Sequence, residues 1–133
     1  MTYQLDFGGL LQYVDVLAKG VGMTVMLITI GGASGVAVGM FGAWARGFSR
    51  MPWLAALVGC YVELIRNTPF LVQLLFIFFG LPSAGIQLSA LDAALLAIVV
   101  NLGAYATEII RAGVEAVPRA QIEAAGLAVA AAG

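Results

Sequence analysis

Apolar residues fill three long stretches of the chain, and shorter polar segments separate them. The first stretch, 21–44, carries no charge and is long enough to cross a bilayer as a tilted helix. The second, 54–80, is longer than a hydrocarbon core of about 30 Å requires. The third, 89–110, has charged side chains only near its ends, at Asp92 and Glu108. This pattern predicts an all-α membrane bundle with three transmembrane helices.

The second stretch contains charged residues and a proline in surroundings that should be apolar. Glu63 and Arg66 stand three positions apart, so they share one helical face and can neutralise each other. Pro69 has no N–H to donate to the carbonyl of Ile65, which predicts a kink. Charged groups inside a membrane are expensive and mark either a site or a structural pair. Two interpretations stay open: an ion pair that locks the helix into its bundle, or a gate that faces a polar pathway.

More polar side chains follow along the same stretch. Asn67 and Thr68 place hydrogen-bonding groups beside the carbonyls that the proline leaves free, and Gln73 extends the polar face. Broken backbone at membrane depth is tolerated where it is buried or lines a cavity. The segment from Glu63 to Gln73 is therefore the strongest candidate for a pathway-lining region.

The third stretch carries fewer polar groups. Asn101 lies about midway, where an amide needs a hydrogen-bonding partner across a helix interface. Glu108 lies near the end, three positions before Arg111, so these two side chains can form an interfacial ion pair. Each residue can serve the bundle alone, or the bundle and a pathway together.

Small residues form a stripe on the first stretch. Gly31, Gly35 and Gly39 recur every fourth position, which is the spacing that lets two membrane helices approach closely. The stripe predicts a packing seam with a partner helix. It leaves open whether the seam is fixed or permits sliding.

Composition narrows the class of protein. Hydrophobic residues make up 62% of the chain and charged residues 10%, with a mean hydropathy of +1.04. Soluble domains carry roughly 25% charged residues, so an integral membrane protein is indicated. The net charge is -1 with scattered basic residues, which argues against a nucleic-acid partner.

The chain has no histidine, a single cysteine and no phosphate-binding loop, so we expect no catalytic residue, no metal site and no bound cofactor.

Basic residues near the ends of the stretches predict the orientation. Lys19 precedes the first stretch, whereas four arginines fall together if the N-terminus lies outside; these are Arg46, Arg50, Arg111 and Arg119. Because basic residues accumulate on the cytoplasmic side, we expect the N-terminus outside and the C-terminal segment in the cytoplasm.

Three blocks of this sequence, in their order and spacing, resemble a known family. They are 61–74 (YVELIRNTPFLVQL), 103–113 (GAYATEIIRAG) and 117–125 (VPRAQIEAA), and 20–24 (GVGMT) is similar to the family's entry to its first span. The blocks resemble the permease subunits of ATP-binding cassette (ABC) importers for polar amino acids. The last block ends in Glu123, Ala124 and Ala125, which are similar to the family's cytoplasmic EAA loop.

The resemblance implies a fold and a set of partners. The chain would be the N-terminal part of a type I importer permease, in a bacterial inner membrane, with a cytoplasmic coupling helix at about 118–132. That helix, with Arg119 and the EAA residues, would dock on a separate ABC ATPase subunit that hydrolyses ATP. A second permease subunit, identical or homologous, and an external or periplasmic amino acid binding protein would complete the assembly. Glu63 to Pro69 and Gln73 would belong to the pathway-forming helix.

The sequence also departs from the family pattern. A glycine expected four positions after the EAA residues falls on Val129, and the chain ends at Gly133, before the later spans that complete such a pore. An alternative function is therefore a truncated, non-transporting membrane fragment that assembles with a full-length permease or antagonises it.

Overall fold

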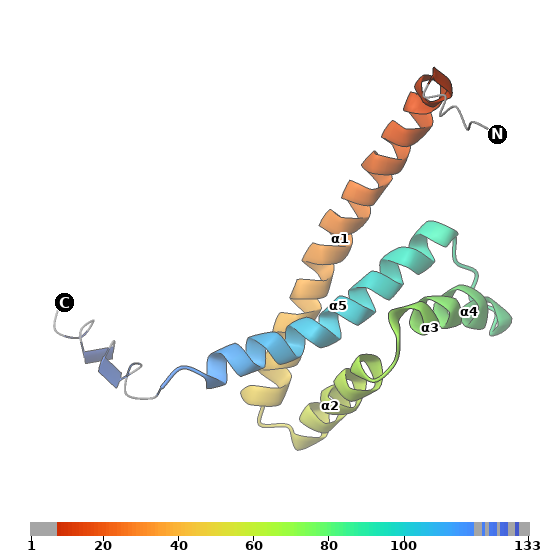
Figure 1. Cartoon of the computed structure of the whole chain (residues 1–133). Coiled ribbons are helices and arrows are strands. Elements are labelled where there is room, and N and C mark those ends of the chain that lie inside the picture. The colour runs from red at the N-terminus through yellow and green to blue at the C-terminus, as the bar shows by residue number, and fades with distance from the viewer. Residues whose placement is uncertain (1–7, 119–120, 122, 125, 128–129, 131–133) are drawn as a thin grey trace, which may run out of the picture.

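The computed structural model describes residues 8–118, 121, 123–124, 126–127 and 130, and these residues contain helices and short connections but no strand (Figure 1). A 3-10 turn over Gly8–Tyr13 leads into the first long helix. The helices then run in this order: α1 (Val14–Gly47), α2 (Pro52–Arg66), α3 (Phe70–Leu75), the π-helical turn η2 (Phe76–Gly80), α4 (Leu81–Ser83) and α5 (Ala90–Glu115).

Helix α1 is one continuous helix of 34 residues. At about 1.5 Å per residue it is longer than a bilayer core of about 30 Å, so the expected span over 21–44 lies inside it. Figure 1 shows its N-terminal half extending away from the other helices. Its most apolar window is only 11% buried. Large apolar side chains such as Val21, Val25 and Ile28 are exposed there, as expected of a surface that faces lipid.

The second apolar stretch is not one kinked helix. It divides at Asn67–Pro69 into α2 and a second limb made of α3, η2 and α4, and the two limbs meet at a bend of 107°. The predicted break at Pro69 is present. The second limb continues through Ser83, because Pro82 is well accommodated in the first turn of a helix.

Helix α5 begins where the sequence provides a cap. The Ser89 side chain accepts a hydrogen bond from the backbone N–H of Asp92 at 3.1 Å, which satisfies one of the free donors of the first turn. The helix then continues past Ile110 to Glu115. Arg111 bonds to Glu115 one turn further on, which supports the additional turn.

Helices α1 and α5 form the main interface, and they run in the same direction. Gly31 on α1 lies against Ile98 on α5, and further along both helices Gly39 lies against Ala106. Helix α2 packs beside this pair. The residues that meet from α1, α2 and α5 form a small buried core: Ala45, Val58, Val62 and Ala104.

By length and composition, α1 and α5 can each cross a membrane, and the bent pair of α2 with α3–α4 adds a third candidate if it is counted as one span.

Candidate functional site

A buried glutamine closes the break between α2 and α3. The Gln73 side chain is 6% exposed. Its Nε2 donates to the carbonyl oxygens of Ile65 and Thr68, each at 2.8 Å. The carbonyl of Ile65 is the one that loses its helical donor because Pro69 has no N–H. A side chain thus replaces the missing backbone bond, which is how broken helices persist at membrane depth.

The same glutamine ties the break to α5. The Nδ2 of Asn101 donates to the Oε1 of Gln73 at 3.0 Å. The sequence predicted that Asn101 needs a hydrogen-bonding partner on another helix, and in the structure that partner is Gln73. We call these two residues, with the carbonyls of Ile65 and Thr68, the polar knot.

The remaining polar residues of the break serve the end of α2. Asn67 ends this helix and its backbone N–H donates to the carbonyl of Glu63 at 3.1 Å. The Thr68 hydroxyl donates to the carbonyl of Leu64 at 2.7 Å. The side chain of Asn67 remains exposed.

Of the two interpretations of Glu63 and Arg66, the ion pair does not form in the part of the chain that the structure describes. Three salt bridges occur there, and neither residue takes part in one. Both residues are exposed on the last turn of α2. The Arg66 guanidinium instead lies 6.0 Å from the centre of the Tyr105 ring on α5, within the range of a cation–π contact. An exposed pair gains little free energy, so the fold loses little when Glu63 and Arg66 stay apart.

A polar hollow lies where α2 ends beside α5. Four residues line it, Glu63, Arg66, Asn67 and Tyr105, around a volume of about 390 Å³. Glu63 and Asn67 also line an adjoining groove of about 540 Å³, which reaches Arg46 and Cys60. The hollow therefore holds a carboxylate, a guanidinium, an amide and a phenol.

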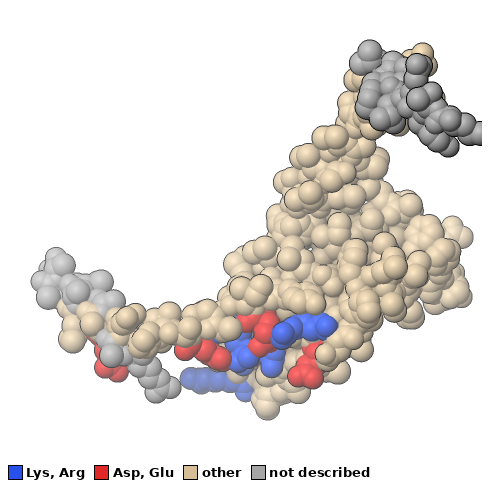
Figure 2. Space-filling model, in the orientation of Figure 1, with Lys and Arg blue, Asp and Glu red and all other residues tan. Residues whose placement is uncertain are grey.

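Charged side chains link the ends of α1 and α5. Figure 2 shows that basic and acidic side chains gather along one edge of the face in view. Arg46 Nη1 lies 2.6 Å from Glu108 Oε2, and Arg111 bonds to both Glu108 and Glu115. The interfacial pair of Glu108 with Arg111 is thus present. The sequence did not reveal Arg46 as a partner, because 62 positions separate it from Glu108.

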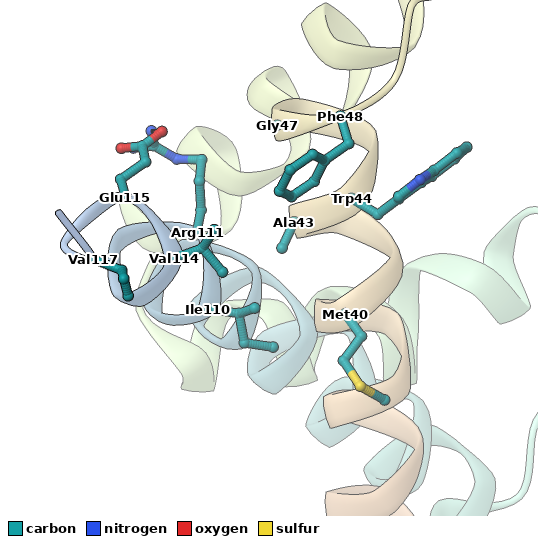
Figure 3. A pocket seen from close by; sticks show the side chains of 10 residues that line it. All are labelled: Met40, Ala43, Trp44, Gly47, Phe48, Ile110, Arg111, Val114, Glu115 and Val117. Carbon is teal, nitrogen blue, oxygen red and sulfur yellow. Dashed lines mark hydrogen bonds and ion pairs between the residues drawn. The ribbon is translucent and has the colours of Figure 1, made fainter. Parts of the chain in front are cut away.

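A second groove, of about 520 Å³, lies between the C-terminal ends of α1 and α5. Figure 3 shows Met40 and Ala43 of α1 on one side and Ile110 and Val114 of α5 on the other. Arg111 and Glu115 also line this groove, and their charges already bond within the chain. This leaves the groove mostly apolar.

The glycine stripe faces α5. A Cβ atom at Gly31 would lie 2.8 Å from Ile98, and at Gly35 it would lie 2.9 Å from Leu102. At Gly39 it would overlap Ala106.

Sequence reasoning missed the next member of this seam, Gly42. It lies against the fully buried Thr107 of α5. Its place three positions after Gly39 is the signal that could have identified it.

The residues expected to couple this chain to an ATPase subunit lie only partly within the described residues. Glu123 and Ala124 are helical and exposed. Arg119 and Ala125 lie outside the described residues. Among the described residues, no group of three or more histidine, cysteine, aspartate or glutamate side chains comes together to hold a metal ion.

Fold and site together define a helical membrane protein with a polar, hydrogen-bonded break beside its main helix interface. Residues 35–128 match the family described as the binding-protein-dependent transport system inner membrane component. The chain belongs to this family.

Relatives extend the similarity over most of the chain. It is 35% identical over 128 residues to the glutamine transport system permease protein GlnP of Escherichia coli, covering 94% of this chain and 57% of that protein. It is 32% identical to the arginine transport system permease protein ArtQ of Bacillus subtilis, and the match covers 91% of this chain and 55% of that protein. It is 38% identical to the L-cystine transport system permease protein TcyB of Bacillus subtilis, and the match covers 85% of this chain and 48% of that protein.

A solved structure agrees with the fold. The crystal structure of an amino acid ABC transporter with histidines matches with a TM-score of 0.84 and 37% identity, covering 92% of this chain and 57% of that one. The chain thus spans about half the length of the curated relatives that it matches.

Proposed function

We propose that this chain is a membrane-spanning portion of the permease subunit of an ATP-driven importer for polar amino acids. The observation that carries this proposal is similarity over nearly the whole chain to permeases of glutamine, arginine and L-cystine transport systems. The exposed apolar surface of α1 supports a place among membrane lipids. The polar break between α2 and α3 supports a pathway for a polar solute.

The proposal includes three spans. The common direction of α1 and α5 along their shared seam supports a segment between them that carries the chain back across the membrane. The two limbs, α2 and α3–α4, are apolar enough to do so together. A re-entrant loop would return the chain to the side of the membrane that it left, and α5 would then be antiparallel to α1.

We propose that the protein lies in the bacterial inner membrane, with its N-terminus outside the cell membrane. Arg46 and Arg111 bond to the same carboxylate, so they lie at one end of the bundle, and Arg50 follows directly after α1. Basic residues collect on the cytoplasmic side of a membrane. The family description as an inner membrane component supports the same location.

The segment after Val117 is assigned to coupling. Glu123 and Ala124, beyond α5 in the sequence, are helical and exposed, and a short helix can dock into a groove on a soluble partner. Arg119 and Ala125 are assigned the same role from the sequence. The partner is an ATPase subunit that hydrolyses ATP, and a second permease subunit and an external binding protein complete the importer.

Charge reversal at Glu123 tests this assignment. In cells that lack the native gene, Glu123→Arg should abolish amino acid uptake and copurification of the ATPase, while the protein still inserts into the membrane. Asp15→Arg is the matched control, because Asp15 is an exposed acid near the start of α1, and it should retain both. Uptake and ATPase association at the level of the unaltered protein in Glu123→Arg would refute the coupling role.

A further inference from the structure

We infer that the polar hollow at the end of α2 binds the charged α-carboxylate and α-ammonium groups that all amino acids share. This inference rests on the proposed function and names the chemistry that the pathway recognises. Its basis is the juxtaposition of Glu63, Arg66, Asn67 and Tyr105 around one hollow of about 390 Å³. That volume falls within the range of about 300–1,000 Å³ that is usual for small-molecule sites.

In the described part of the chain, neither charge of the hollow is held in a salt bridge. Among the described residues, Glu63 and Arg66 take part in none of the three salt bridges, although Glu108 and Arg111 nearby are fully paired. Charges of a membrane segment normally find partners or mark a substrate route. A charge of each sign, left open on one helical turn, matches a ligand that itself carries both signs.

The geometry suits a zwitterion. Arg66 can take the α-carboxylate in a two-pronged contact, which its planar guanidinium favours. Glu63, one turn earlier on the same face, can take the α-ammonium. The exposed amide of Asn67 and the half-open ring of Tyr105, against which Arg66 already lies, add a hydrogen-bonding group and an aromatic wall.

The position at a broken helix supports this assignment. Discontinuous membrane helices place free backbone groups and helix ends at substrate sites. The C-terminal end of α2 carries partial negative charge, which favours a cation such as the Arg66 guanidinium on its last turn. The polar knot satisfies the carbonyls of Ile65 and Thr68, and neither Gln73 nor Asn101 lines the hollow.

The site would recognise the common part of the substrate and leave its side chain to other contacts. Amino acids with different side chains should therefore bind alike. An analogue that lacks either charged group should bind poorly. This selectivity separates a substrate site from a pair of structural charges.

The test uses the assembled importer, permease with ATPase in lipid nanodiscs, without binding protein, and saturation-transfer NMR to measure weak binding. The probes are L-glutamine, L-arginine, 4-aminobutanamide, which is glutamine without its α-carboxylate, and 4-carbamoylbutanoate, which lacks the α-ammonium. The two amino acids should bind with similar affinity. Each analogue should bind about tenfold or more weakly, as expected for one lost charge-assisted contact.

Variants then locate the site. Arg66→Gln and Glu63→Gln should each weaken L-glutamine binding about tenfold, and Arg66→Lys should restore only part of it because lysine cannot make the two-pronged contact. Arg50→Gln is the matched control, since Arg50 is exposed and lies in the connection between α1 and α2.

Three results would overturn the inference: equal binding of the analogues and the amino acids, unchanged binding in both variants, or no binding to the unaltered importer. The first needs no mutation, so misfolding of a variant cannot obscure it. If the unaltered importer still carries L-glutamine into cells, such a result refutes the hollow alone. If no polar amino acid is carried, the proposed function fails as well.

Discussion

Two regions of this molecule hold helices together by opposite means. Along the seam between α1 and α5, the positions of Gly31, Gly35 and Gly39 carry no side chain, so the two helix backbones approach closely. At the break between α2 and α3, Gln73 and Asn101 add side-chain hydrogen bonds where backbone bonds are missing. The seam depends on shape, and the break depends on polarity.

The difference shows what a membrane permits at each place. Between apolar helices in lipid there is little hydrophobic gain, so association relies on close packing of small residues. At a broken helix, by contrast, carbonyl groups must be satisfied inside the protein. A close-packed seam tolerates no added atoms, whereas a bonded break can be altered one contact at a time. The following predictions test this contrast.

The largest effect should come from filling the seam. In Gly39→Leu the side chain would have to occupy space held by Ala106 and the backbone of α5. We expect a loss of about 3 kcal/mol or more in the free energy of unfolding in detergent, since overpacking of this kind forces the helices apart. Gly32→Leu is the matched control, because nothing lies within 4 Å of a Cβ at Gly32. Equal stability of the two variants would contradict the seam.

Removing the polar knot should have the next largest effect. Gln73→Leu removes the donor that the carbonyls of Ile65 and Thr68 share and the acceptor of the Asn101 amide. The carbonyl of Ile65 keeps the backbone N–H of Thr68, at 3.3 Å. At about 0.6–1.7 kcal/mol for each interhelical bond in a membrane, the expected loss of stability is about 2 kcal/mol. Gln87→Leu, in the exposed connection before α5, should change little. The same unfolding assay measures both, and a stable Gln73→Leu protein would show that the break does not need its bonds.

The charged ends of α1 and α5 should contribute less. Arg46→Gln removes an ion pair of 2.6 Å with Glu108. The Glu108 carboxylate would still be paired with Arg111. Both side chains of the lost pair are partly exposed, at 25% and 21%, so we expect a loss of about 1 kcal/mol. The loss should shrink as salt is added. Arg50→Gln serves as the control, and an effect independent of salt would mean that packing, not charge, is lost.

An effect of similar size should arise where the two kinds of contact meet. Tyr61 of α2 donates to the carbonyl of Val100 at 2.5 Å and also reaches the position of Gly103. Tyr61→Phe keeps the ring and loses the bond, so a loss of about 0.5–1.5 kcal/mol is expected. Tyr13→Phe, at a side chain that is 62% exposed, should be neutral. A loss well above this range would place Tyr61 within the seam.

The sequence predicted the elements of this fold better than their partners. Pro69 marked the break, and the spacing of Gly31, Gly35 and Gly39 marked the seam, because both depend on local geometry. The 107° bend did not follow, since a proline limits a helix without setting the direction of the next limb.

Pairing between distant residues was not predictable. Glu63 and Arg66 are neighbours on one helix, so their spacing suggested a pair, yet Arg66 turns to Tyr105 on another helix. Arg46 meets Glu108 only because α1 and α5 run in the same direction. A single sequence carries no direct signal of that arrangement.

Uptake into proteoliposomes tests the central claim most directly. The complete permease would be reconstituted with its ATPase and binding protein, with ATP on the ATPase side, and labelled L-glutamine, L-arginine and L-cystine supplied on the other. At least one of them should accumulate above its supplied concentration, and only when ATP and the binding protein are both present. Failure of all three to accumulate in an assembled complex, or uptake that ignores ATP, would contradict the account of this chain as part of an ATP-driven amino acid importer.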